Sequence, residues 1–150
     1  MLLAALAGLF AMPAMADVLA TEGWARATVP GTKVAAGYLV LTNKGEKERS
    51  LLRIESPLCD IVRIHLSSVD NQGVARMWPV GKLALQPGEI VRFSPNGLHV
   101  MLEGIKAPFK TGDKVPLKLQ FDGGEPEITV LLDVRALTDA APAPANHDHH

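Results

Sequence analysis

The sequence predicts an all-β protein, either an antiparallel β-sandwich or a barrel, and three observations lead to that prediction. About eight short apolar segments follow one another along the chain, each bounded by residues that favour turns. Several segments alternate apolar and polar residues, which is the period of a half-buried strand. No stretch keeps a helical apolar period between capping residues. Short strands at such intervals are typical of antiparallel sandwiches and barrels.

Four strands are predicted in the first half of the chain. The first three end at residues that tolerate tight bends, namely Asn-Lys-Gly, Ser-Pro and the DNQG turn at 70–73. The segments are AAGYLVLTN (35–43), RSLLRIE (49–55), CDIVRIHLSSV (59–69) and VARMWPV (74–80).

The second half continues the pattern with Pro-Gly and Asp-Gly-Gly turns, and the segment KAPFKTGDK (106–114) is predicted to be a loop. The predicted extended segments are GKLALQPGE (81–89), EIVRFSPNG (89–97), NGLHVML (96–102), VPLKLQF (115–121) and EITVLLDVRAL (127–137).

The composition favours one globular domain that has no nucleic-acid or lipid partner. The 150 residues suit a single domain, and 47% hydrophobic with 21% charged residues are ordinary values for a chain that buries a core. A formal net charge of −1 gives no electrostatic reason to bind nucleic acid or an anionic membrane. The aromatic content of 5% is low for a base-stacking surface.

Residues 1–16 have the features of a signal peptide. The run MLLAALAGLFAMPAMA is apolar and ends in Ala14-Met15-Ala16, the small-x-small pattern after which signal peptidase cleaves. The run is shorter than the ~20 residues of a membrane span. No Lys or Arg precedes it, and a buried N-terminal helix is the alternative. We expect an exported protein whose folded domain covers residues 17–137.

The composition changes again after residue 137. The segment TDAAPAPANHDHH (138–150) alternates Ala and Pro, which favours an extended, disordered tail, and it ends in His147, His149 and His150. Histidine and carboxylate ligands suit Cu(II), so these three residues are a candidate second metal site. A solvated tail without metal is the alternative.

The chain lacks the motifs of the common enzyme classes. It has no G-x-S-x-G, phosphate-binding loop, G-x-G-x-x-G or H-E-x-x-H sequence, and we therefore expect a protein that is not an enzyme. Its one cysteine, Cys59, excludes an intramolecular disulfide and a C-x-x-C redox motif. The apolar neighbours of Cys59 predict a small buried side chain.

Two histidines and two methionines are the only ones between residues 17 and 137, and they lie within 37 residues: His65, Met77, His99 and Met101. Both histidines alternate with an apolar stripe, so each lies on the strand face opposite the hydrophobic one. Met101 shares the face of His99, two positions away. The DNQG turn can fold the segment of Met77 back beside the strand of His65.

Two imidazoles and two thioethers make a soft, neutral ligand set that suits Cu(I). Ca²⁺ and Mg²⁺ prefer oxygen ligands, and Zn²⁺ sites use Cys, His and carboxylate. Thioethers do not protonate, and a site without thiolate can release its metal to a stronger acceptor. Each residue also has a purely structural interpretation, because Met commonly fills cores and a lone His commonly packs or lies at the surface.

From GWARAT (23–28) to LLDVRA (131–136) the chain resembles the PCuAC family of periplasmic copper chaperones. The family motif is His, a position that is often Met, ten residues, Met, 21 residues and His-x-Met. This sequence has His65, Leu66, ten residues, Met77, 21 residues and His99-Val100-Met101. The flanking segments AAGYLVLTN, GVARMWPV and SPNGLHVMLEGI are also similar. Because Leu66 replaces the optional Met, no third thioether is expected.

The resemblance implies a cupredoxin-like antiparallel β-sandwich with Greek-key-type connections. It also implies Cu(I) bound by His65, Met77, His99 and Met101 in the periplasm. Delivery would be to the CuA centre of cytochrome c oxidase, alone or together with a Sco-type chaperone. A His-rich extension like residues 138–150 occurs in some members of the family.

Two other functions remain open from the sequence. An electron-transfer cupredoxin needs a Cys thiolate with two His and a weak axial ligand, and Cys59 lacks the Cys-to-His-to-Met loop that such a site requires. A metal-free interaction sandwich needs none of the four residues as ligands.

Overall fold

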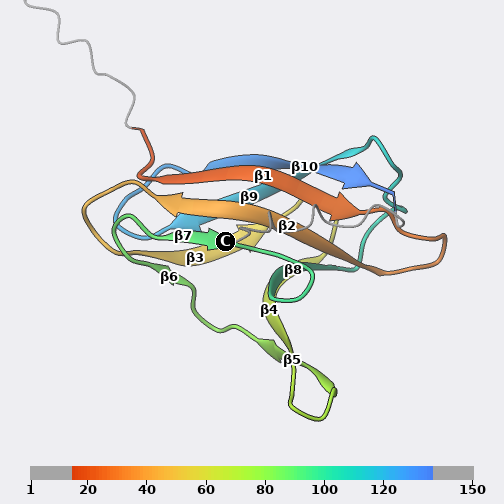
Figure 1. Ribbon diagram of the computed structural model, residues 1–150. Helices are drawn as coiled ribbons and strands as arrows, with labels where there is room; N and C mark the ends of the chain where they lie inside the picture. Colours follow the sequence, from red (N-terminus) through yellow and green to blue (C-terminus); the bar gives the residue numbers. More distant parts are fainter. Residues whose placement is uncertain (1–14, 137–150) are drawn as a thin grey trace, which may run out of the picture.

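The computed structural model describes residues 15–136, and this part of the chain contains ten strands and no helix (Figure 1). The strands are β1 (Val18–Arg26), β2 (Val34–Asn43), β3 (Arg49–Glu55), β4 (Ile61–Val69), β5 (Ala75–Pro79), β6 (Ala84–Leu85), β7 (Ile90–Arg92), β8 (Leu98–Glu103), β9 (Lys114–Phe121) and β10 (Ile128–Arg135).

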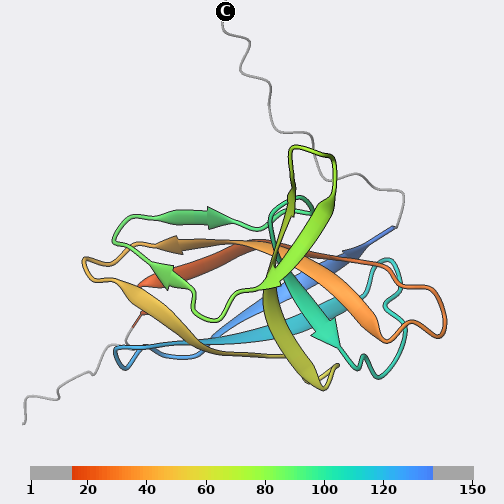
Figure 2. The same cartoon turned by 90° about the horizontal axis from the view of Figure 1, so that it is seen from below.

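The strands form one curled sheet in the order β5-β4-β8-β2-β1-β10-β9-β3-β6, and β7 pairs with β2 (Figures 1 and 2). Only β1–β2, β4–β5 and β9–β10 are both consecutive in the chain and neighbours on this path. The other connections cross over, as Greek-key connections do. The predicted all-β, cupredoxin-like fold is confirmed. Every pairing is antiparallel except that of β1 with β10, which is parallel.

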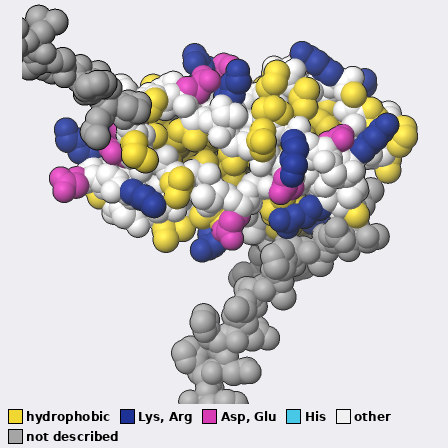
Figure 3. Space-filling view, turned by 90° about the horizontal axis from the view of Figure 1, so that it is seen from above, with side chains coloured by type: hydrophobic (Ala, Val, Ile, Leu, Met, Phe, Trp, Pro, Cys, Tyr) yellow, Lys and Arg dark blue, Asp and Glu magenta, His cyan; other side chains and the backbone are white. Residues whose placement is uncertain are grey.

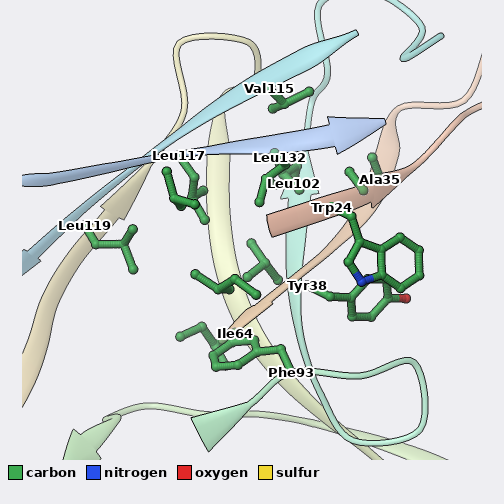
Figure 4. Packing of buried hydrophobic residues seen from close by; sticks show 14 of the residues in the cluster. Trp24, Ala35, Tyr38, Ile64, Phe93, Leu102, Val115, Leu117, Leu119 and Leu132 are labelled. Atoms are coloured by element: carbon green, nitrogen blue, oxygen red, sulfur yellow. The ribbon is translucent and has the colours of Figure 1, made fainter. Parts of the chain in front are cut away.

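The core lies inside the curl and is filled by alternate residues of several strands (Figure 4). Leu39 and Leu41 of β2, Leu102 of β8 and Leu132 of β10 are almost completely buried. Each of these leucines stabilises the fold by removing apolar surface from water, about 2 kcal/mol for a fully buried side chain. The core therefore holds rigid the strands on which the candidate site is built.

Strand β1 is the element that the sequence analysis missed. Its apolar alternation is broken by a register shift against β2 between Thr21 and Trp24. Glu22 has a φ of 53°, and Gly23 packs so closely on β10 that an added Cβ would lie 2.9 Å from the Leu131 carbonyl oxygen. A bulge of this kind hides the period of two from a sequence pattern.

The hairpin of β4 and β5 projects from the body of the molecule (Figures 1 and 2). Every residue of β5 is exposed, because β5 is the last strand at one end of the sheet path. On the face of the molecule in Figure 3, basic and acidic side chains are interspersed among apolar ones, in agreement with the net charge of −1.

Two predictions fall on residues that the structure does not describe. The proposed signal peptide, residues 1–16, lies outside the described residues except at its last two positions, and so does the tail with His147, His149 and His150. Both stay predictions, as do the boundaries of the folded domain. Residues 15–136 contain no helix that is long and apolar enough to span a membrane.

Candidate metal centre

His65 and His99 lie directly opposite each other on neighbouring strands. The register of β4 and β8 pairs His65 with His99, and their rings meet edge to face with centroids 5.8 Å apart. On the other face of the same strands, Ile64 pairs with Val100 and both are buried in the core. Packing of this hydrophobic face fixes the register and so brings the two imidazoles together.

The β4–β5 hairpin brings Met77 to His65, as the turn signal at 70–73 predicts. Met77 pairs with Ser67, which lies on the same face as His65 two positions along β4. The sulfur Sδ of Met77 is 3.2 Å from Nδ1 of His65. One thioether and one imidazole nitrogen therefore already point at a common position.

Asp70 holds the turn that places Met77. One oxygen of its carboxylate, Oδ1, accepts the backbone N–H groups of Gln72 and Val74, each at 2.9 Å. Arg76 donates to the second oxygen at 3.4 Å. The Val74 N–H, followed by those of Gln72 and Arg76, lowers the pKa of Asp70 below its ordinary value of 3.8. The ionised carboxylate thus fixes the hairpin.

Met101 lies on the same face of β8 as His99 and opposite Arg63 of β4. It is half-buried, and Ala36 of β2 lies beside it on the other flank. Arg63 forms an ion pair with Glu103 at 3.5 Å, so its charge is partly compensated at this end of the site. The register therefore places all four candidate residues on one face of β5, β4 and β8.

The burial of the four residues is graded. The sequence pattern puts both histidines on a face away from the apolar stripe, but His99 is only 4% exposed, whereas the Met77 side chain is 53% exposed. In the sheet, β8 lies between β4 and β2. The Nδ1–H of His99 donates to the Gly97 carbonyl at 3.1 Å, since a carbonyl can only accept. The lone pair on Nε2 is therefore the one left for another ligand.

The donor set of the site is soft. Among the described residues, no cluster of three or more His, Cys, Asp or Glu side chains is placed to hold a metal ion. The groups that meet are instead the imidazoles of His65 and His99 and the thioether of Met77, and a second thioether, that of Met101, lies on the same face. Imidazole and thioether are ligands that Cu(I) accepts and that Ca²⁺ and Mg²⁺ do not.

Cys59 stands apart from the site. It precedes β4 and is buried, with Sγ near the carbonyl oxygens of Ser56 and Ile61. It lies in the bend before β4, and His65 is about 13 Å beyond the first residue of that strand. Burial, with a further contribution from Asp60, raises the pKa of the thiol and keeps it protonated. The prediction of a small buried side chain is confirmed.

Leu66 and Trp78 are next to candidate ligands in the sequence but lie on the opposite face of the hairpin. Leu66 pairs with Trp78 across the hairpin, and both alternate with residues of the site. They lie on the opposite face of the hairpin from His65 and Met77. A methionine at the optional family position would therefore not face the four candidate ligands.

Asp70 and Gly97 are contributors that sequence reasoning did not assign to the site. An aspartate at the first position of a predicted turn was the available signal for Asp70. The Gly97 carbonyl carried no signal, because its role depends on the local path of the chain before β8.

Comparison with known proteins identifies the family to which the chain belongs. A family model described as "Putative lipoprotein LpqE-like" matches residues 18–134. The chain belongs to the LpqE-like family. A curated relative, "Putative lipoprotein Lxx21020" of Leifsonia xyli subsp. xyli, is 23% identical over 107 residues, which cover 71% of this chain. The match spans 63% of the length of that relative.

Solved structures of PCuAC domains have the same fold. A copper-bound PCuAC domain from PmoF2 matches with a TM-score of 0.67 at 23% identity, covering 82% of this chain and 96% of that domain. DR1885 from Deinococcus radiodurans matches in its apo form with a TM-score of 0.61 at 25% identity, covering 94% and 93%. Its Cu(I) form matches at 0.58 and 27% identity, covering 86% and 83%. The resemblance to the PCuAC family is confirmed.

Proposed function

We propose that this protein is an exported copper chaperone that binds Cu(I) through His65, Met77, His99 and Met101 and passes it to a copper acceptor. The observation that carries the proposal is the convergence of Met77 and His99 on His65. Met77 of β5 and His99 of β8 lie on opposite sides of β4, and both contact the imidazole of His65.

The distances suit a shared ion. If the bonds have the lengths of Zn–N and Zn–S bonds in proteins, about 2.0–2.1 and 2.3 Å, a separation of 3.2 Å between Nδ1 and Sδ corresponds to an angle of about 95° at the metal. A Cu(I) ion there needs little rearrangement of His65 and Met77. We expect His99 to contribute Nε2, which its bond to Gly97 leaves free. We expect Met101, two residues further along the same face of β8, to complete the set.

The graded burial suits transfer rather than storage. His99 is held in the sheet, whereas Met77 lies on a strand in which every residue is exposed. An acceptor therefore approaches from the β5 side and displaces the thioether of Met77 first. The remaining ligands keep the ion bound until the acceptor supplies its own. The role is that of a carrier and requires no catalytic step.

The comparisons support this function. The names of the similar structures describe PmoF2 as copper-bound and DR1885 as a Cu(I) form. The resemblance to periplasmic chaperones supports the periplasm as location and the CuA centre of cytochrome c oxidase, directly or through a Sco-type protein, as acceptor. The LpqE-like family name agrees with an exported protein.

Residues 147–150 provide a second proposed site. His147, His149 and His150 with Asp148 form a nitrogen and oxygen set that suits Cu(II). These ligands differ from the imidazole and thioether ligands of the folded domain. The two sites can therefore be distinguished by the oxidation state of copper that each prefers, and by substitution of the three histidines.

An electron-transfer cupredoxin is disfavoured by the position of Cys59. A blue-copper site needs a thiolate beside two imidazoles, and this thiol is buried in the segment before β4 and has a raised pKa. A metal-free interaction sandwich predicts instead that the four residues tolerate replacement with no effect on copper.

A competitive titration distinguishes these functions. The variant H147A/H149A/H150A, which leaves only the folded site, is titrated with Cu(I) against a chromophoric chelator such as bicinchoninate. One tight equivalent that is lost on further substitution of His65→Ala and kept on Leu66→Ala supports the chaperone. An intense blue Cu(II) complex would support electron transfer, and the absence of binding at sub-micromolar free copper would refute a copper function.

A further inference from the structure

Arg26 and Arg135 differ from the other arginines of the chain. The sequence has seven arginines. Within residues 15–136, Arg49, Arg53, Arg63, Arg76 and Arg92 each form an ion pair with a carboxylate. Neither Arg26 nor Arg135 has such a partner in this part of the chain. Their guanidinium carbons lie instead 6.0 and 5.1 Å from the centre of the Trp24 ring.

The parallel pairing of β1 with β10 places these two charges together. Arg26 is directly opposite Arg135, and Trp24 is opposite Asp133. Like charges at paired positions repel, and the π-face of Trp24 offsets part of that cost. Hydrogen bonding to Lys114, with a smaller contribution from Arg135, lowers the pKa of Asp133. That carboxylate forms its ion pair with Lys114 and with neither arginine.

The arginine pair lies on the same sheet face as the candidate metal centre. Trp24 pairs with Tyr38 of β2, and their rings pack 4.4 Å apart (Figure 4). Ala36, on the same side of β2 as Tyr38, pairs with Met101 of β8. Paired residues share a face, so the row runs from β1 through β2 to Met101 and His99. Two strand spacings, about 10 Å, separate β1 from β8.

We propose that Arg26 and Arg135, which lie over the ring of Trp24, form a docking site for another protein. That protein is the partner that exchanges copper with this one, and it presents a carboxylate-rich surface. This inference rests on the proposed function only in taking copper as the cargo that the two proteins exchange. Guanidinium groups bind carboxylates in a planar, two-bond geometry, and here two of them are presented together.

The size and charge of the face fit this role. A standard interface covers about 800 Å² on each partner, which is enough to include both the arginine pair and the metal centre. The chain as a whole carries a net charge of −1 and does not attract an acidic protein. The local positive charge therefore sets the orientation in which such a partner approaches, with its acidic groups at β1 and its copper ligands toward β8 and β5.

The test uses an acetylated hexaglutamate peptide as the probe. It is titrated at low ionic strength into the isotope-labelled full chain, and the indole N–H resonance of Trp24 reports binding by nuclear magnetic resonance. We expect binding to the unsubstituted protein and a loss of at least about tenfold in affinity for R26Q/R135Q. The variant R26K/R135K keeps both charges and retains most of the binding. The control R53Q/K118Q removes two cations from β3 and β9 and binds as the unsubstituted protein does.

Equal affinity of R26Q/R135Q and R53Q/K118Q for the peptide would overturn the proposal, and so would a shift of resonances remote from Trp24. Binding to phosphatidylglycerol vesicles without binding to the peptide would also overturn it, in favour of a lipid surface. A parallel Cu(I) titration of R26Q/R135Q tests the metal centre separately. We expect unchanged copper affinity, so a failure of docking is distinguishable from a failure of the proposed function.

Discussion

Replacing Met77 with leucine separates a metal ligand from a structural residue. Leucine has nearly the volume of methionine but no sulfur, so the substitution removes the atom that lies 3.2 Å from Nδ1 of His65. The side chain is 53% exposed and lies on an edge strand, where a change of similar volume alters the free energy of unfolding by less than about 0.5 kcal/mol.

The expected loss of Cu(I) affinity is much larger. Removal of a group that only orients a metal ligand costs about 10–100-fold in affinity, so removal of a direct ligand costs at least about 100-fold. This factor corresponds to about 2.7 kcal/mol of binding free energy. The expected result is a large effect on copper with almost none on folding.

The assay measures both quantities on the same protein. Competition with bicinchoninate gives the Cu(I) affinity in the H147A/H149A/H150A background, and thermal unfolding of the apo form gives the stability. Trp78→Phe, on the other face of the hairpin, is the matched control and keeps the affinity. Unchanged copper affinity in Met77→Leu would refute the assignment of Met77 as a ligand.

Three other predictions concern the hairpin and the core. Asp70→Ala removes the oxygen that accepts the N–H groups of Gln72 and Val74, and it weakens Cu(I) binding up to about tenfold. Asp70→Asn keeps Oδ1 and most of the Cu(I) affinity. The same competition assay measures both variants. In the folded protein the pKa of Asp70 lies below 3.8, so the carboxylate stabilises the hairpin fully above pH 3.8. This stabilisation is lost as the pH falls through the lowered pKa. The amide chemical shifts of β5 report the loss. Leu102→Ala, in the core, lowers the free energy of unfolding by about 2–5 kcal/mol in urea titrations.

Much of the fold was predictable because local signals were strong. Alternation and turn residues predicted segments that include most of β2, β4 and β10. Strand β1 was missed, since the bulge at Thr21–Trp24 breaks its alternation, and the extended segment at 81–89 contains only the two residues of β6. The order of the strands depends on packing between distant segments, which no local pattern encodes.

The candidate site divides in the same way. Alternation predicts that His99 and Met101 share a face, and the turn predicts that Met77 returns to His65. The direct pairing of His65 with His99 joins two strands that are far apart in sequence, and the hydrophobic packing of Ile64 on Val100 determines it. The burial of His99 was not predictable, because alternation alone places His99 on the face away from the apolar stripe.

X-ray absorption spectroscopy of the H147A/H149A/H150A variant with one equivalent of Cu(I) tests the central claim most directly. We expect a first shell of mixed ligands, with nitrogen and sulfur at distances near those of zinc sites, about 2.0–2.1 Å and about 2.3 Å. The sulfur contribution falls in Met77→Leu and in Met101→Leu and is unchanged in Cys59→Ala. A first shell without sulfur, or sulfur that disappears only in Cys59→Ala, would contradict it.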